Sequence, residues 1–164
     1  MALHVFPAIL VLVCSGLAAS AHAATCSPAQ KAQVAASYDA FRSASRAGNL
    51  KQVKALSSVS VAAKIASFEK STSNPAALAR QMGGVMPALA TAIKVVCEYS
   101  GKNARLIINT EAVSESGQRI PLSSVVMFQQ VQDRGWLVGD KATTNPFSAQ
   151  PVGELLKHKA LQLF

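Results

Sequence analysis

The strongest constraint on the fold lies in residues 119–140, where two apolar segments flank an Asp-Arg-Gly break. The first segment is rich in β-branched residues and ends near Phe128, and the second contains Trp136-Leu137-Val138. Such segments on either side of a turn with Asp and Gly predict a β-hairpin. The first strand is long, and a long strand must twist or curve to pack against other elements. We therefore expect a curved antiparallel sheet with one face covered by helices from earlier in the chain.

Two more strands are expected just before this hairpin. From residue 94 onward the apolar period is two, so that Val95, Cys97 and Tyr99 share one face of a strand. A Ser-Gly-Lys-Asn turn separates this strand from a second one over residues 104–112. With the hairpin, these strands predict a four-stranded meander.

Helical patterns occupy the chain before the strands. Ser27, Pro28 and Gln30 form a helix start with a capping box, and apolar residues follow on one helical face until Gly48. Asn49 begins a short second helix.

Two further helical segments follow. Val61, Ile65 and Phe68 lie at helical spacing in a third segment. A fourth starts at residues 74–75 and is interrupted at Gly83-Gly84, so we expect a kink or two short helices. The expected fold class is α+β, with N-terminal helices packed on a curved antiparallel sheet of about four strands.

The first 23 residues have the features of a secretory signal peptide. An apolar segment over 6–17 precedes the small-x-small sequence Ala21-His22-Ala23, and it is shorter than the ~20 residues of a membrane span. We therefore divide the chain into a signal peptide (1–23), a single α+β domain (24–142) and a C-terminal linker with a short basic amphipathic tail (143–164). The expected location is the periplasm or the outside of the cell. Within the tail, residues 153–164 predict a short helix that docks on the domain, contacts a membrane surface or frays.

Cys26 and Cys97 are the cysteines that remain after removal of the signal peptide. An oxidising compartment favours a disulfide between them, which would close a loop of about 70 residues. Two cysteines without a nearby histidine do not make a metal site, so no metal and no cofactor are expected.

The chain has 16 Lys and Arg residues against 8 Asp and Glu, a net charge of +8. This charge favours anionic partners such as lipid headgroups, cell-wall polymers or an acidic protein, although it also promotes solubility. The basic residues are scattered and few aromatic residues lie among them, so the pattern does not favour nucleic-acid binding.

The order of the elements resembles the nuclear-transport-factor-2-like superfamily, and is most similar to small exported members without an assigned function. The resemblance covers residues 28–140. It rests on a first helix that ends in Ala47-Gly48-Asn49, a short second helix, and Gly135-Trp136 before the last strand. It implies a cone-shaped domain with a cavity between helices and sheet, and dimerisation through the sheet. The residues that would border this cavity are Tyr38, Phe41, Phe68, Tyr99 and Phe128, although periodicity alone places them in the core.

The superfamily includes enzymes similar to ketosteroid isomerase and polyketide cyclases, which transfer protons with Asp, His and Tyr. Residues 24–142 contain no histidine, the usual general acid or base near neutral pH. Tyr38 and Asp39 are adjacent on a helix and point about 100° apart. There is also no nucleophile elbow and no phosphate-binding glycine loop. We therefore expect no catalytic residue.

The function expected is that of an exported, non-catalytic binding or scaffolding domain. It would use a hydrophobic cavity or the sheet face to bind a small apolar ligand or a partner protein. The alternative is an isomerase-like or cyclase-like enzyme with Tyr38, Asp39 or Tyr99 in the cavity. A third possibility is membrane-surface contact through the basic tail at Lys157-His158-Lys159.

Overall fold

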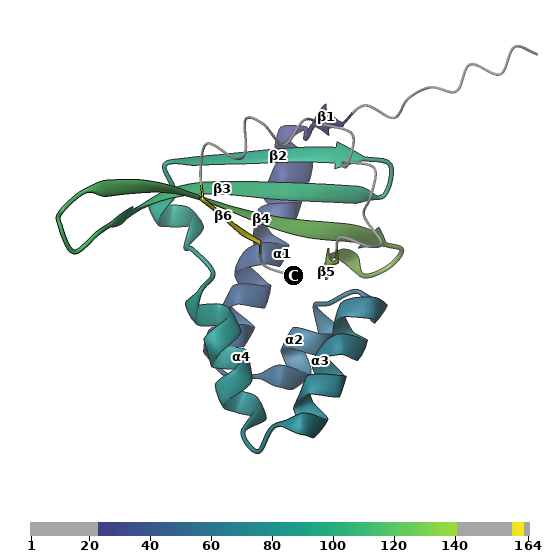
Figure 1. The fold of residues 1–164 in the computed structure, drawn as a ribbon. Helices are drawn as coiled ribbons and strands as arrows, with labels where there is room; N and C mark the ends of the chain where they lie inside the picture. Colours follow the sequence, from purple (N-terminus) through teal and green to yellow (C-terminus); the bar gives the residue numbers. More distant parts are fainter. Residues whose placement is uncertain (1–22, 141–158, 163–164) are drawn as a thin grey trace, which may run out of the picture.

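The computed structural model describes residues 23–140 and the backbone of residues 159–162, and it confirms the α+β class. The signal peptide expected at 1–23 therefore falls almost wholly outside the described residues. Four α-helices and one 3-10 helix pack with a sheet (Figure 1). The helices are α1 (Pro28–Arg46), α2 (Leu50–Ala55), α3 (Val59–Ser71), α4 (Pro75–Gly84) and η1 (Leu89–Thr91). The strands are β1 (Ala24–Thr25), β2 (Lys94–Ser100), β3 (Asn103–Val113), β4 (Arg119–Val131), β5 (Gly135–Gly139) and β6 (Lys159–Gln162).

The sheet has the order β1-β2-β3-β4-β5, and each of these neighbouring pairs is antiparallel. The predicted meander of β2 to β5 is confirmed. Its longest pairing joins β3 to β4, from Asn103 opposite Gln129 to Val113 opposite Arg119. The short β1 was not predicted, because a strand of two residues is too short to show an alternating apolar pattern.

The helix expected over residues 153–164 is wrong at Lys159–Gln162, which form β6. This strand pairs with Leu122–Val125 of β4 in the parallel sense. The short β5 pairs only with Met127–Val131, so without β6 the rest of that edge of β4 would have unpaired N–H and C=O groups. A short helix without tertiary partners is marginal in water, whereas this open edge provides hydrogen bonds for a strand.

The core lies between α1 and the helix-facing side of the sheet. On α1, Val34, Tyr38 and Phe41 are fully buried at helical spacing. On the sheet, Leu106 of β3 is paired with Val126 of β4, and both are buried. In Figure 1, α1 crosses behind the strands, while α2, α3 and α4 extend away below the sheet.

The predicted helix starts are confirmed in detail. Ser27 accepts from the backbone N–H of Gln30, whose side chain accepts from the N–H of Ser27, so the capping box is complete. Asn49 and Asn74 cap α2 and α4 in the same way, each accepting from a backbone N–H three residues later. Gly48 follows α1 with φ +72°, a conformation that glycine adopts without strain.

The glycine pair at residues 83–84 divides the fourth helical segment as predicted. α4 ends at Gly84, and η1 follows after a non-helical stretch. Gly83 packs directly on α1, because a Cβ at this position would lie 2.6 Å from the backbone N of Arg46. A Cβ at Gly84 would meet nothing within 4 Å. Close helix packing therefore explains the first glycine of the pair.

One expected core position differs. Val61 and Ile65 of α3 are buried as predicted, but Phe68 on the same helical face is 61% exposed. Helical periodicity predicts which way a side chain points. It does not predict how far the neighbouring elements extend to cover that side chain. The core thus ends before the last turn of α3.

Candidate functional site

The structure brings together three of the five residues predicted to border a cavity. Tyr38, Phe41 and Phe128 are fully buried in one apolar core, and Tyr99 is partly buried against it. Phe68 lies apart from this core, with its ring largely in solvent. Their role as ligand-binding residues stays a prediction.

The hydroxyl of Tyr38 is occupied by the backbone. It donates to the carbonyl oxygen of Pro87 at 2.7 Å, and Nε of the neighbouring Arg42 donates to the carbonyl of Met86 at 3.0 Å. Burial raises the pKa of Tyr38 above its ordinary value of 10.0, partly offset by Arg42, while the adjacent Asp39 adds to the rise. This side chain therefore holds the segment after α4 and keeps its proton.

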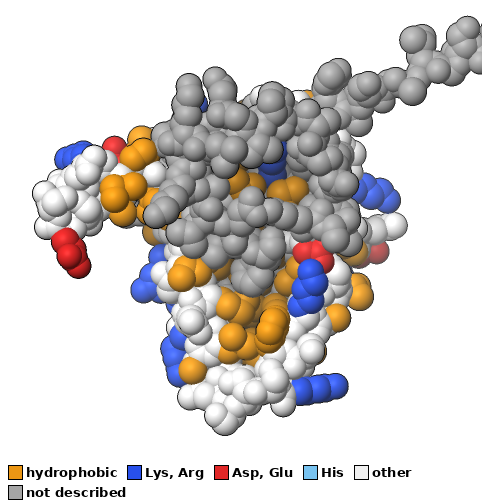
Figure 2. Space-filling model, in the orientation of Figure 1, with side chains coloured by type: hydrophobic (Ala, Val, Ile, Leu, Met, Phe, Trp, Pro, Cys, Tyr) orange, Lys and Arg blue, Asp and Glu red, His pale blue; other side chains and the backbone are white. Residues whose placement is uncertain are grey.

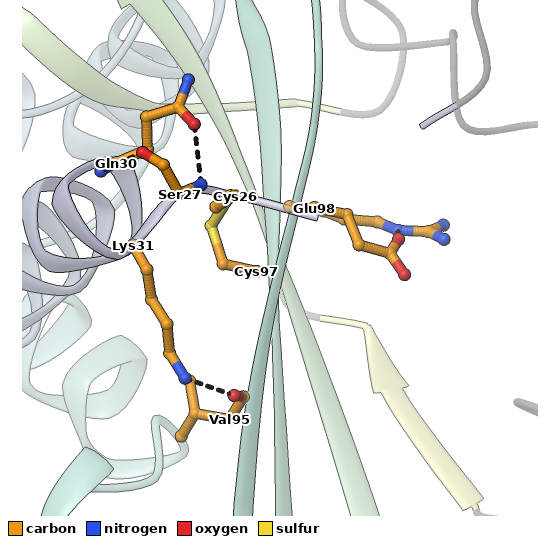
Figure 3. The surroundings of a disulfide bond; sticks show 8 residues. Cys26, Ser27, Gln30, Lys31, Val95, Cys97 and Glu98 are labelled. Carbon is orange, nitrogen blue, oxygen red and sulfur yellow. Dashed lines mark hydrogen bonds and ion pairs between the residues drawn. A yellow bond between two sulfur atoms is a disulfide. The ribbon is translucent and has the colours of Figure 1, made fainter. Parts of the chain in front are cut away.

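The predicted disulfide between Cys26 and Cys97 is present (Figure 3). The bond links the segment before α1 to β2 across 71 residues of sequence, and the N–H of Cys26 also donates to the carbonyl of Cys97. Nearby, the ammonium of Lys31 donates to the carbonyl of Val95 at 2.8 Å. The start of α1 is thus fastened to the sheet by covalent and hydrogen bonds.

An open cleft of about 700 Å³ lies between α1 and two turns of the sheet. Gln33, Ala36 and Ser37 of α1 form one wall, since residues three and four apart share a helical face. Lys102 of the β2–β3 turn and residues 130–136 of the β4–β5 hairpin form the remainder. This volume is within the range of small-molecule sites, roughly 300–1,000 Å³.

Two contacts fix the turns that border the cleft. The N–H of Gln130 donates to the carbonyl of Lys102 at 2.7 Å, which holds the β2–β3 turn beside β4. The guanidinium of Arg134 donates to the carbonyl of Ala55 at 2.6 Å, which ties the β4–β5 turn to α2. Asp133 and Gly135 both have positive φ, so the hairpin reverses within three residues. Hydrogen bonds therefore hold the backbone of both turns that line the cleft in place.

Trp136 lines this cleft and is the single tryptophan of the chain. It is the second residue of β5, opposite Gln130 of β4, and only 5% of its surface is exposed. Its indole Nε1–H is buried and has no hydrogen-bond acceptor among the described residues. A buried donor without an acceptor costs about 1–3 kcal/mol. The nitrogen itself has almost no exposed surface, so only the small exposed part of Trp136 faces the cleft.

The surface also has an apolar region away from this cleft. Figure 2 shows hydrophobic side chains gathered between α4 and the α2–α3 pair, below the sheet. Two half-buried residues pack on the core in this region of the chain: Leu56, directly after α2, and Met82 of α4.

The described residues hold no grouping for metal chemistry: no three His, Cys, Asp or Glu side chains lie close enough together to bind an ion. Nor does any helix in the described part of the chain have the length and apolar character of a membrane span. Asp39, a candidate in the enzyme alternative, is exposed while Tyr38 beside it is buried. These two side chains do not face a common site.

Sequence reasoning missed the residues of the cleft. Gln33, Ser37 and Lys102 are polar residues without a motif, and they meet only because two turns of the sheet converge on α1. The one available signal was Trp136, a lone tryptophan next to a turn, where an aromatic ring commonly serves recognition.

Comparison with known proteins identifies no relative: no family model, no curated protein and no solved structure matches the chain.

Proposed function

We propose that the protein is a non-catalytic binding domain that holds a small molecule in the cleft between α1 and the β4–β5 hairpin. The observation that carries this proposal is an open cleft of about 700 Å³, within the size range of ligand sites, whose wall includes the exposed Lys102 and Ala36.

The proposal that the domain is non-catalytic is supported by its ionisable groups. A catalytic acid or base needs a proton that it can release or accept near neutral pH. The raised pKa of Tyr38 and the hydrogen bond to Pro87 favour a structural role for that hydroxyl. The remaining candidates of the enzyme alternative lie on separate elements, Asp39 on α1 and Tyr99 on β2.

We also propose export and membership of the nuclear-transport-factor-2-like superfamily. The Cys26–Cys97 disulfide supports an oxidising compartment. The order of a capped first helix, a short second helix and a C-terminal meander supports the superfamily.

Native mass spectrometry with two tryptophan substitutions tests the binding function. The purified protein is incubated with a small-molecule extract of its producing cells, and the expected result is a non-covalent complex. Ala36→Trp, an exposed position on the cleft wall, should abolish this complex by filling the space. Ala29→Trp is the matched control, because it is exposed on the same face of α1 but about 10 Å along the helix, outside the cleft. Equal complexes in both variants, or none with the unmodified protein, would contradict the proposal.

A further inference from the structure

The charged side chains of the cleft give it a net positive charge, while its glutamines and Ser37 can each donate or accept a hydrogen bond. Lys102 and Arg134 contribute two positive charges and Asp133 one negative charge, which leaves +1. A ligand that complements this charge presents a negative group.

The two cations are not equally available. The guanidinium of Arg134 already donates to the carbonyl of Ala55. The ammonium of Lys102 is exposed at the rim, and no described residue within hydrogen-bond or ion-pair distance engages it. An ammonium that offers three donors at the edge of a partly enclosed site is suited to a carboxylate, sulfonate or phosphate group.

The apolar part of the cleft suggests the rest of the ligand. The side chains of Ala36 and Val131 and the exposed edge of Trp136 provide apolar lining beside the polar groups. The apolar lining and the cationic rim belong to one cleft, so one molecule can use both.

We propose that the ligand of this cleft is a small organic anion with an apolar body. Its anionic group binds Lys102, and its apolar part lies against Ala36 and Val131. This inference rests on the proposed binding function and adds the chemical class of the ligand. The excess of basic over acidic residues in the whole chain favours the approach of such an anion.

Two dyes that differ by one sulfonate group test the ligand class. 8-Anilinonaphthalene-1-sulfonate is anionic, and N-phenyl-1-naphthylamine has the same aromatic skeleton without the charge. Binding to the cleft is defined as the part of the dye fluorescence that Ala36→Trp removes. We expect the dissociation constant of the sulfonate to be about tenfold lower than that of the neutral dye, and the difference to shrink with added salt.

Charge substitutions assign this preference to Lys102. Lys102→Glu should weaken binding of the sulfonate about tenfold and leave the neutral dye within about twofold. The matched control is Lys51→Glu, the same change in charge at an exposed position of α2 outside the cleft, which should alter neither dye. Asp133→Asn should strengthen binding of the sulfonate, since it removes the opposing charge.

The outcomes separate the two proposals. Equal affinity of both dyes for the cleft would overturn the anion class and leave the binding function intact. Fluorescence that Ala36→Trp does not reduce would place the dyes elsewhere and overturn both proposals. A sulfonate preference that Lys102→Glu and Lys51→Glu reduce equally would overturn the role of Lys102, because the effect would then follow net charge alone.

Discussion

Replacing Gly83 with alanine tests the packing of α4 on α1. The added Cβ would lie 2.6 Å from the backbone N of Arg46 and 2.9 Å from the backbone C of Ser45. These are backbone atoms of a 19-residue helix, so relief requires the two helices to move apart rather than a side chain to turn. Overpacking of this kind costs about 1–3 kcal/mol. The same change at Gly84 meets nothing within 4 Å and provides a matched control.

The two variants share the intrinsic effect of the substitution. Alanine is favoured over glycine in a helix by about 0.5–1 kcal/mol, and both positions lie in the last turn of α4. This gain cancels when the variants are compared with each other. Gly83→Ala should therefore be less stable than Gly84→Ala by about 1–3 kcal/mol, the overpacking cost alone.

Urea unfolding followed by circular dichroism and by Trp136 fluorescence measures this difference. We expect Gly83→Ala to shift the midpoint downward with an unchanged m value, because the denatured state is the same. Two variants with free energies of unfolding within about 0.5 kcal/mol of each other would refute the close approach of α4 to α1.

The remaining predictions concern the disulfide, the buried tyrosine and the edge of β4. Removing the disulfide by the Cys26→Ser/Cys97→Ser double substitution should lower the free energy of unfolding by up to about 4 kcal/mol, since it bridges a separation of 71 residues; an unchanged urea midpoint would contradict this. Tyr38 has a raised pKa in the folded state, so its contribution to stability is complete below pH 10 and is lost as the pH rises further. The stability advantage of the unmodified protein over Tyr38→Phe should therefore shrink from pH 9 to pH 11, and a constant difference would count against the burial effect. Deleting residues 159–164 should increase hydrogen exchange in Leu122–Val125, which lose the pairing with β6, and equal protection in both proteins would argue against that strand.

The parts of the fold that could be predicted depend on local chemistry. The cap at Ser27, the break at Gly48 and the turn at Asp133 each act within a few residues, and the structure has them where the sequence placed them. The period-two alternation of β2 correctly separated Cys97 from Glu98. On the opposite face from Cys97, the Glu98 carboxylate is partly buried and paired with Arg105, which the alternation does not reveal.

What could not be predicted depends on distant partners. Arg105 lies opposite Glu98 because of the β2–β3 register, which the sequence of one strand does not contain. β6 forms a strand because β5 leaves part of the β4 edge open, a consequence of strand lengths. The cleft arises in the same way, since Lys102 and Trp136 come from different turns and neither belongs to a motif.

The most direct test of the central claim is the indole N–H signal of Trp136 in a ¹H–¹⁵N correlation spectrum. One tryptophan gives one indole cross-peak, so the signal reports on the cleft wall without assignment of other residues. We predict that 8-anilinonaphthalene-1-sulfonate shifts this cross-peak in a saturable manner, and that Ala36→Trp, after allowance for its second indole signal, abolishes the shift. A cross-peak that stays in place while the dye binds would contradict the claim that this cleft is the ligand site.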